Sequence, residues 1–334
     1  MTGQGGQPRL GPGRTNFILD GVAKGSRRTF KIFKLGHYQG TESLALFEAL
    51  WQAAPDMKKR RALRKVFLGA LLTTLFVVML RWFEYHQVYQ PGREMAAACA
   101  DLGRPCEDVR FETSDAVELN GWFFPAGTDS PRGRLVILIC HGNGGNISHR
   151  LDLYQALLET GVSVFAFDYR GYGRSRGHPS EEGTYRDAQA AHAWLQRKGF
   201  TGGEIIVYGE SLGGGVASEL CLREETGGLI LQSTFTSIPD IGAELFPWLP
   251  VRWLGGIRYD TRGKLPRLKM PVLILHARHD GLVGFHHAEE NFAAAVEPKL
   301  FREIGGDHND PLADRARFLE GIEEFLKVVE RSNR

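Results

Sequence analysis

Short apolar runs that alternate with helical patterns are the feature of this sequence that most limits its fold. From residue 106 onward, most apolar runs are followed by a segment whose apolar residues recur at helical spacing. Strands buried on both faces and separated by helices form a parallel, doubly wound sheet, so we predict an α/β fold. The predicted strands are 109–112 and 117–124, as a hairpin, then 135–140, 162–167, 205–208, 229–231 and 272–275; the predicted helices are 151–159, 182–198, 214–223, 285–296 and 312–329.

A serine flanked by glycines follows one of these strands. The pentapeptide Gly-Glu-Ser-Leu-Gly at 209–213 stands directly after strand 205–208 and leads into a helix. The pattern Gly-x-Ser-x-Gly at such a turn is a nucleophile elbow, which lifts the hydroxyl of Ser211 above the sheet at a helix N-terminus. Only glycine is tolerated on either side of a turn this tight. A plain glycine and serine turn is the alternative, but the strand and helix context favours the elbow.

A serine hydroxyl is a poor nucleophile until a base takes its proton, and the sequence offers eleven histidines. In sites of this kind the chain order is serine, acid, histidine. His308 stands in a loop after the run that ends at Ile304, so we predict that it is the base. Asp280 follows strand 272–275 at the carboxyl edge of the sheet, and we predict that it orients the imidazole. Loop or surface positions are predicted for His276, His279, His286 and His287, and structural roles for Asp260 and Asp307.

Negative charge on a substrate oxygen requires backbone N–H donors, which form an oxyanion hole. One donor is expected from Leu212, directly after the serine, and the other from the loop that follows strand 135–140. In that loop we choose Asn143, with Gly144 as the rival. His141 has no carboxylate or cysteine at ligand spacing, so a structural hydrogen-bonding role is favoured over metal binding. We therefore assign no metal ligand and no cofactor-binding residue.

A basic cluster leads directly into an apolar segment. Met57 is followed by six basic residues, after which 66–80 contains no charge. This is the order of an export signal or a membrane anchor. Aromatic residues within 82–85 extend the segment toward the roughly 20 residues that a bilayer needs. The residues after the apolar run are too large for signal cleavage, so we predict an uncleaved transmembrane anchor over 57–87, with a buried core helix as the alternative.

The anchor also predicts how the rest of the chain is arranged. Basic residues stay on the cytoplasmic side of a membrane. The domain over 88–334 is therefore expected to face outward, as part of a single-pass membrane protein. Residues 1–56 contain no motif, although 42–54 has the spacing of a short helix, and we predict a poorly structured extension. Because Met57 begins a complete anchor signal, it is a candidate start of translation.

The net charge bears on whether the chain binds nucleic acid, and the cysteine content bears on whether it contains disulfides. The net charge of +2 is too near balance to indicate nucleic acid. Four cysteines in 334 residues do not form a disulfide framework. Cys140 and Cys221 are predicted to lie in the core, whereas Cys99 and Cys106 flank a loop and are able to pair if the domain is exported. The sequence leaves that pairing open.

Several segments together resemble the α/β-hydrolase domain proteins. The resemblance is carried by the loop 141–150, the stretch 167–175, the elbow 209–213 and His308 after a glycine pair, and it covers 88 to the C-terminus. The most similar subgroup is described as serine aminopeptidase-like hydrolases, many of which carry one N-terminal membrane anchor. The resemblance implies the α/β-hydrolase fold. It also implies that Asp168 and Arg170 brace the loop after the fourth strand.

The resemblance further implies that an insertion at about 234–269 forms a short cap over the site. Its aromatic residues are expected either to line an acyl pocket or to form a small satellite core. The insertion contains Phe246, Pro247, Trp248, Leu249, Pro250 and Trp253.

The predicted function is that of a serine hydrolase, resembling carboxylesterases, lipases and thioesterases, which cleaves an ester or thioester through an acyl-enzyme on Ser211. The apolar cap and the anchor favour a small acyl or lipid-like substrate. Two alternatives remain: a serine peptidase of the aminopeptidase type, which the family resemblance suggests, and a non-catalytic anchored binding module.

Overall fold

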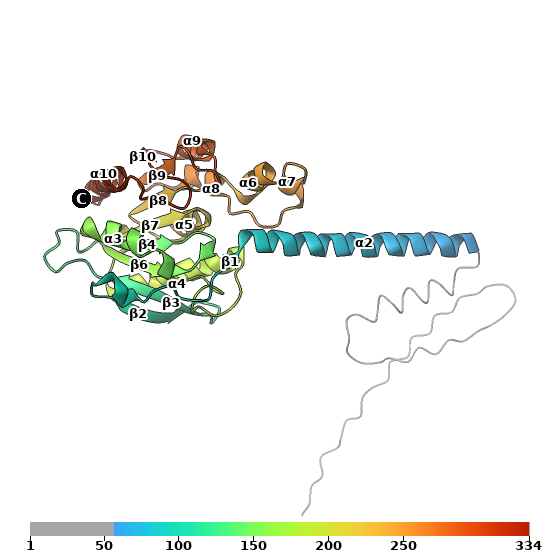
Figure 1. Ribbon diagram of the computed structural model, residues 1–334, viewed down its shortest axis with the longest axis horizontal. Coiled ribbons are helices and arrows are strands. Elements are labelled where there is room, and N and C mark those ends of the chain that lie inside the picture. Colours follow the sequence, from blue (N-terminus) through green and yellow to red (C-terminus); the bar gives the residue numbers. More distant parts are fainter. Residues whose placement is uncertain (1–56, 334) are drawn as a thin grey trace, which may run out of the picture. The chain divides into compact units, whose positions relative to one another are not determined.

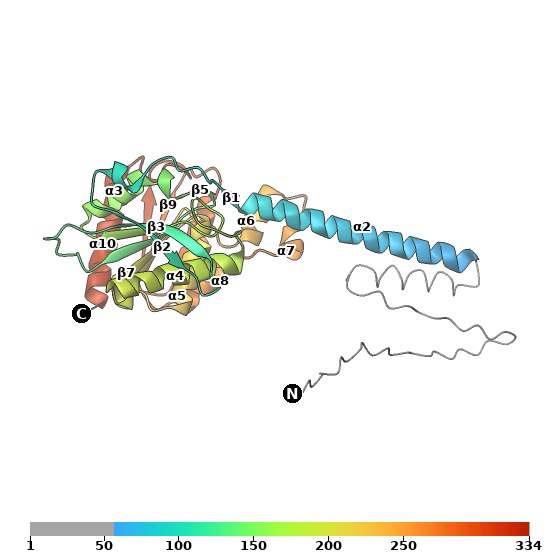
Figure 2. The same ribbon diagram turned by 90° about the horizontal axis from the view of Figure 1, so that it is seen from below.

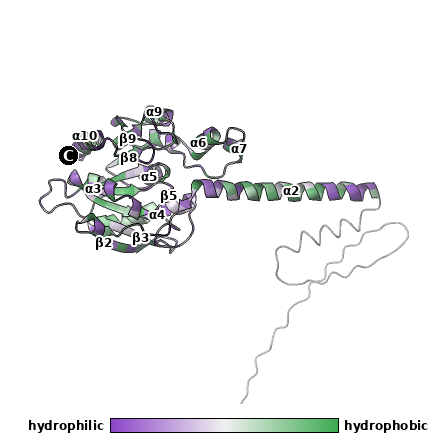
Figure 3. Ribbon diagram, in the orientation of Figure 1, coloured by the Kyte–Doolittle hydropathy of each residue, from purple (hydrophilic) through white to green (hydrophobic). Residues whose placement is uncertain are grey.

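The computed structural model describes residues 57–333, and the boundary between the two units of the chain lies between Leu71 and Leu72. This division falls inside helix α2 (Met57–Val88), which is long and apolar enough to cross a membrane. Figure 3 shows the hydrophobic residues along it. The apolar stretch of α2 is exposed, so the alternative of a buried core helix is wrong. The predicted extension 1–56 and its helical spacing lie outside the described residues.

An eight-stranded sheet forms the centre of the second unit (Figures 1 and 2). Its strand order is β10-β9-β8-β7-β4-β6-β3-β2. β3 is antiparallel to both neighbours and the other pairs are parallel, which confirms the predicted α/β fold and the hairpin before the parallel strands. The strands are β2 (Glu107–Glu112), β3 (Glu118–Phe124), β4 (Val136–Cys140), β6 (Ser163–Phe167), β7 (Ile205–Glu210), β8 (Gly228–Gln232), β9 (Val272–Ala277) and β10 (Lys299–Ile304).

Successive side chains along each strand point to opposite faces of the sheet, and they form two hydrophobic cores, one on each face. On β4, Val136, Leu138 and Cys140 belong to one core, and Ile137 and Ile139 belong to the other. Because neighbouring side chains on a strand point to opposite faces, an unbroken apolar run fills both cores. Helices α4, α5 and α9 cover the first face, and α3 and α10 cover the second. Figure 2 shows α4 and α5 on the opposite side of the sheet from α3. Their bounds are α3 (Leu151–Glu159), α4 (Glu181–Lys198), α5 (Leu212–Arg223), α9 (Phe285–Ala294) and α10 (Arg315–Ser332).

A segment directly after α2 joins the loop that follows β4. Strand β1 (Gln90–Pro91) pairs in parallel with β5 (Gly144–Gly145), separately from the main sheet. A disulfide joins Cys99 to Cys106, the pairing that the sequence left open, and Cys140 and Cys221 are buried as predicted. The short 3₁₀ helices are Cys99–Leu102, Ile147–His149, Gly202–Glu204 and Leu265–Arg267.

The chain between β8 and β9 contains three short helices, α6 (Ile238–Leu245), α7 (Val251–Leu254) and α8 (Thr261–Lys264). We call residues 234–269 the cap, following the predicted insertion. Ser237 caps the N-terminus of α6, where its side chain accepts a hydrogen bond from the Asp240 N–H. The aromatic ring of Phe246, directly after α6, meets that of Phe83 near the C-terminal end of α2. The cap is therefore packed against the last turns of α2.

Candidate active site

The turn that carries Ser211 connects β7 to α5. Ser211 has a φ of 50°, a conformation that non-glycine residues rarely adopt. A Cβ on Gly209 would lie 2.6 Å from the carbonyl oxygen of Gly213, and a Cβ on Gly213 would strike the backbone carbonyl of Cys140. The two glycines are thus required because the turn and the neighbouring strand leave no space for a side chain.

Ser211, His308 and Asp280, the three residues predicted from the sequence, come together above the carboxyl edge of the sheet. The Nε2 atom of His308 lies 3.1 Å from Ser211 Oγ, and its Nδ1 atom lies 2.8 Å from Asp280 Oδ2. Each residue follows a different strand: β7, β9 or β10. Both distances permit hydrogen bonds, so the imidazole is placed to accept the serine proton while Nδ1–H donates to the carboxylate.

The carboxylate of Asp280 is held from both sides. Its Oδ1 atom accepts hydrogen bonds from the N–H groups of Leu282, at 2.9 Å, and Val283, at 2.8 Å. Burial alone favours the neutral acid, but the hydrogen bond and charge of His308 and these two N–H donors outweigh it and lower the pKa of Asp280. The group is therefore an anion at neutral pH.

The predicted oxyanion donors, Leu212 and Asn143, line the same cavity as Ser211 and His308. Leu212 is the first residue of α5, where N–H groups have no acceptor within the helix. The carbonyl of Asn143 accepts hydrogen bonds from the Gln90 N–H, at 3.2 Å, and from the hydroxyl of Tyr172, at 2.9 Å. These bonds hold the loop after β4 in place.

The rival donor Gly144 belongs to β5, opposite Gln90. Its carbonyl accepts a hydrogen bond from Arg150, which also bonds Glu210, the residue before the nucleophile candidate. The sequence patterns did not reveal either charged residue as part of the site. The one signal in the sequence is that Glu210, a charged residue, occupies the first variable position of the Gly-x-Ser-x-Gly motif. Its partner Arg150 stands 60 positions earlier, so the motif does not indicate the pair.

A cavity of about 950 Å³ opens above Ser211. Its walls come from the last turns of α2, the loop after β4, the cap and the loop that carries His308. Phe246 lines it, as one of the two interpretations of the cap aromatics predicted, and Leu249 lines it as well. Trp248 and Trp253 instead are 75% and 87% exposed, so the expectation that they line a pocket or fill a satellite core is wrong. The short cap helices leave no layer above these two rings to cover them.

Two residues near the site are buried without entering the cavity. His141 is fully buried, and its Nδ1–H donates to the Gly142 carbonyl at 2.7 Å, in keeping with the structural role predicted for it. Burial lowers the pKa of His141 to about 3, so the ring is neutral. Asp168 accepts a hydrogen bond from the Ile147 N–H at 2.9 Å, which ties the loop after β6 to the loop after β4.

The other predicted structural residues also make local contacts. Arg170 bonds Asp187 on α4 and Asp115 in the loop between β2 and β3. Asp260 caps α8, and Asp307 accepts hydrogen bonds from the N–H groups two and three residues after it. These contacts hold loops and a helix end in place.

The prediction of loop or surface positions is wrong for two of the four histidines. His276 is fully buried on β9, where Nε2–H donates to the Val283 carbonyl at 2.8 Å behind Asp280. His287 is 1% exposed on α9. The loop after β9 covers His276, and the cap covers His287. Local sequence does not encode either of these contacts. His279 and His286 are exposed, as predicted.

Comparison with known proteins places this geometry in a family. The family model described as serine aminopeptidase, S33, matches residues 131–261. The uncharacterized protein Rv2307c of Mycobacterium tuberculosis is 37% identical over 277 residues, 81% of this chain and 97% of that protein. The α/β-hydrolase domain-containing protein WAV2 of Arabidopsis thaliana is 34% identical over 244 residues, 66% of this chain and 78% of that one.

Solved structures show the same architecture. An esterase of Pyrococcus furiosus has a TM-score of 0.60 and 23% identity, covering 72% of this chain and 97% of its own. A likeness at that identity shows the fold alone. The curated relatives are more similar in sequence and are matched over most of their length. The chain belongs to the α/β-hydrolase family.

Proposed function

We propose that the protein is a serine hydrolase that cleaves an ester or thioester through an acyl-enzyme on Ser211. The observation that carries the proposal is the continuous hydrogen-bonded chain from Ser211 through His308 to Asp280 at the floor of a mostly apolar cavity. A strained serine beside a histidine that a buried carboxylate orients is the arrangement for nucleophilic acyl transfer.

The proposed reaction has two halves. The Oγ atom of Ser211 attacks the acyl carbon while its proton passes to Nε2 of His308, and the oxyanion accepts hydrogen bonds from the N–H groups of Leu212 and Asn143. The imidazolium then gives its proton to the leaving alcohol or thiol. Water attacks the acyl-enzyme by the same route in reverse, with Asp280 remaining ionised throughout, and releases the acid.

The walls of the cavity favour an acyl or lipid-like substrate. Apolar side chains reach it both from α2 and from the cap, and the α2 contribution includes Leu80 at the end of the predicted membrane span. An acyl chain that lies against these walls leaves water with favourable free energy, about 0.8 kcal/mol for each buried CH₂. Apolar lining residues from α2 and the cap include Leu80, Phe83, Val88, Ile238, Ile241, Leu245, Phe246, Leu249, Val251 and Leu254.

An aminopeptidase needs a free acidic group to bind the substrate amine, and two of the four carboxylates that line the cavity, Glu84 and Glu210, are already paired with arginines. Glu84 accepts hydrogen bonds from the N–H groups of Gly256 and Ile257 and pairs with Arg81. Glu210 is paired with Arg150. Asp152 and Asp310 also line the cavity, so we favour ester cleavage because of the apolar walls and keep an aminopeptidase as the alternative.

We further propose that α2 anchors the protein in a membrane as a single span, with its basic N-terminal end in the cytoplasm and the hydrolase domain outside. The length and apolar character of α2 support the span, and the six basic residues after Met57 support the orientation. The disulfide between Cys99 and Cys106 supports an oxidising compartment for the domain.

A fluorophosphonate probe tests the nucleophile. The natural chain is expected to be labelled and Ser211→Ala to be inert, whereas Ser218→Ala, a change on the same helix away from the cavity, should label normally. Equal labelling of the natural chain and Ser211→Ala would refute the assignment. Absence of labelling in both would favour the binding module. A series of acyl esters of increasing length, beside aminoacyl amides, then separates esterase from peptidase activity.

A further inference from the structure

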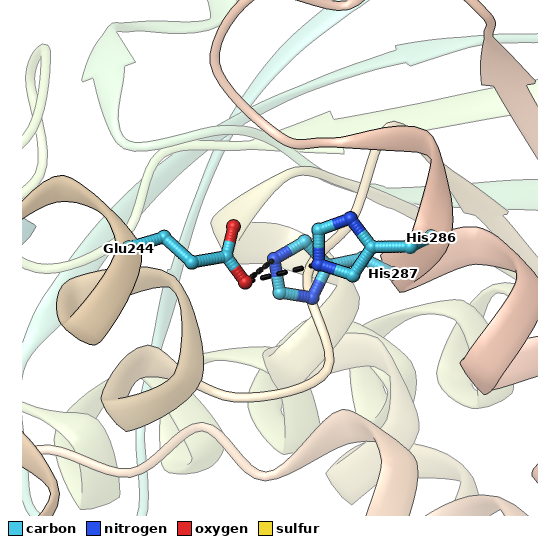
Figure 4. A group of neighbouring side chains, drawn as sticks. All are labelled: Glu244, His286 and His287. Atoms are coloured by element: carbon cyan, nitrogen blue, oxygen red, sulfur yellow. Dashed lines mark hydrogen bonds and ion pairs between the residues drawn. The ribbon is translucent and has the colours of Figure 1, made fainter.

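Two histidines and one carboxylate gather between the cap and the body of the hydrolase domain. Glu244 stands on α6, and His286 and His287 stand in the first turn of α9 (Figure 4). Figure 4 shows both imidazole rings directed at the same carboxylate. Within residues 57–333 this is the one group of three such side chains whose ligand atoms all lie within 4.8 Å of one another.

The spacing of these atoms suits a transition-metal ion. Nε2 of His286 lies 2.9 Å, and Nε2 of His287 lies 3.3 Å, from Oε1 of Glu244. Zinc binds imidazole nitrogen and carboxylate oxygen at about 2.0–2.2 Å, so two ligands in tetrahedral geometry are separated by roughly 3.3 Å. A cation therefore fits among the three atoms with little rearrangement. Three protein ligands leave the fourth position to water.

His287 provides a second observation that points to a ligand. The side chain is 1% exposed, yet its Nε2 atom is buried without a hydrogen-bond partner, because the approach to Glu244 at 3.3 Å lacks hydrogen-bond geometry. An orphaned polar atom in the interior costs free energy. The orphaned nitrogen faces the cluster (Figure 4).

The other ring nitrogen of His287 has a partner that can orient it. Nδ1 lies 3.0 Å from the hydroxyl oxygen of Thr236, which itself donates to Asp240. In one tautomer, Nδ1–H donates to this hydroxyl and the Nε2 lone pair faces the cluster. In the other, the Thr236 N–H, at 3.2 Å, donates to Nδ1. A cation at Nε2 requires the first tautomer, in which Nδ1–H donates to the hydroxyl as metal-bound histidines do and the Thr236 N–H gives up its hydrogen bond to Nδ1.

Charged neighbours on the cap do not compete for the position. Asp240 stands one turn before Glu244 on α6, and it accepts hydrogen bonds from Thr236 and Ser237 and pairs with Arg252 and Arg262. Its charge is therefore already compensated. Glu244, by contrast, has only the two imidazole rings as charged or titratable partners in the described part of the chain. An added cation meets one uncompensated carboxylate and two imidazole rings.

We propose that Glu244, His286 and His287 form a binding site for a divalent transition-metal cation of the zinc class, which fastens the cap to the hydrolase domain. The cation joins α6, which contributes Ile238, Ile241 and Leu245 to the cavity wall, to α9, which begins five residues after Asp280. Binding at this site holds the cavity wall in a fixed position relative to the candidate acid. It does not depend on whether the protein hydrolyses an ester.

Metal titration of the full-length, untagged protein in detergent micelles tests the site. After treatment with a chelator and dialysis, the protein is titrated with Zn²⁺ by calorimetry and with Co²⁺ by visible absorption, and Mg²⁺ serves as a hard cation that prefers oxygen ligands. Glu244→Gln and His286→Ala remove ligands. Both side chains are partly exposed, so these variants are expected to fold. Glu289→Gln and His279→Ala change exposed residues of the same types outside the cluster.

The natural chain and the two control variants are expected to bind one equivalent of Zn²⁺ more tightly than the ligand variants by about 100-fold or more, since loss of a mere outer-shell partner already costs 10–100-fold. Zn²⁺ should also raise the melting temperature of the natural chain but not of Glu244→Gln. Equal stoichiometry and affinity in all five proteins would overturn the proposal. Failure of the natural chain to bind Zn²⁺ would overturn it as well.

Discussion

Arg150 forms two hydrogen bonds with the carboxylate of Glu210, one from Nε to Oε2 at 2.6 Å and one from Nη2 to Oε1 at 3.1 Å. The same guanidinium donates to the carbonyls of Gly144 and Asn146 in the loop after β4. Glu210 directly precedes Ser211, so this pair connects the nucleophile candidate to the loop proposed to supply an oxyanion donor. Two-point contact between planar groups also restricts their relative rotation.

Glu210→Gln should therefore impair the positioning of the site more than it impairs folding. We expect kcat for an acyl ester to fall between about 10- and 100-fold, because small misplacements of reacting groups have effects of that size, while KM changes little. Steady-state kinetics measures this. Glu182→Gln, which disrupts an exposed ion pair with Arg223, is the matched control and should retain full activity. A loss confined to thermal stability would show that Glu210 only supports the fold.

Asp280→Asn should leave the fold intact and reduce kcat by about 10⁴-fold, because an amide in this position no longer selects the tautomer of His308 that accepts the serine proton. The rate of fluorophosphonate labelling should fall in parallel. Near-natural activity in a folded Asp280→Asn protein would remove this residue from the proposed mechanism.

Gly213→Ala should destabilise the protein by about 1–3 kcal/mol and lower labelling of Ser211, because the added methyl group meets the carbonyls of Cys140 and His141 on the neighbouring strand and loop. Gly127→Ala is the matched control, since a Cβ there has nothing within 4 Å. Thermal unfolding compares the two variants. Equal melting temperatures would contradict the close approach of the turn to β4.

Buried His141 should make stability depend on pH below neutrality. Its pKa is about 3 in the folded chain, against an ordinary value of 6.5. The unfolded chain therefore takes up the proton first, so the stabilisation is complete above about pH 6.5 and is lost as pH falls from there toward 3, at about 1.4 kcal/mol per pH unit.

His141→Asn removes this titration while keeping a side-chain donor for the Gly142 carbonyl. Urea unfolding should show the advantage of the natural chain over His141→Asn shrinking by about 2 kcal/mol between pH 6.5 and pH 5. A constant difference across that range would mean that His141 protonates equally in both states.

The disulfide offers a test of the proposed location of the domain. When cells are lysed under denaturing conditions with an alkylating reagent, only the thiols of Cys140 and Cys221 should react, and reduction beforehand should expose two more. Alkylation of all four cysteines without reduction would place the domain in a reducing compartment. Replacing both Cys99 and Cys106 by serine should cost about 2.5 kcal/mol of stability by the chain-entropy estimate for so short a loop.

The α/β fold was predictable because its signals are local. Apolar runs such as 135–140 form strands wherever both faces are buried, and the glycines around Ser211 specify a tight turn between a strand and a helix. The strand ends in turn indicate Asp280 and His308, because parallel strands present their carboxyl ends at one edge of the sheet. The order of serine, acid and histidine along the chain was sufficient to choose these residues.

The partners of Arg150 and His287 were not predictable, since each contact joins segments far apart in the chain. Glu210 lies 60 residues after Arg150, and Glu244 reaches His287 only because the cap folds back over α9. The same packing buries one of two adjacent histidines and exposes the other. Sequence by itself determined the strands, the turn and the order of the acid and the base, because backbone propensity and side-chain periodicity act over a few residues. Tertiary structure alone decided which charges meet, which polar groups lose water and which walls enclose the cavity, because those depend on distances between elements that no local pattern contains.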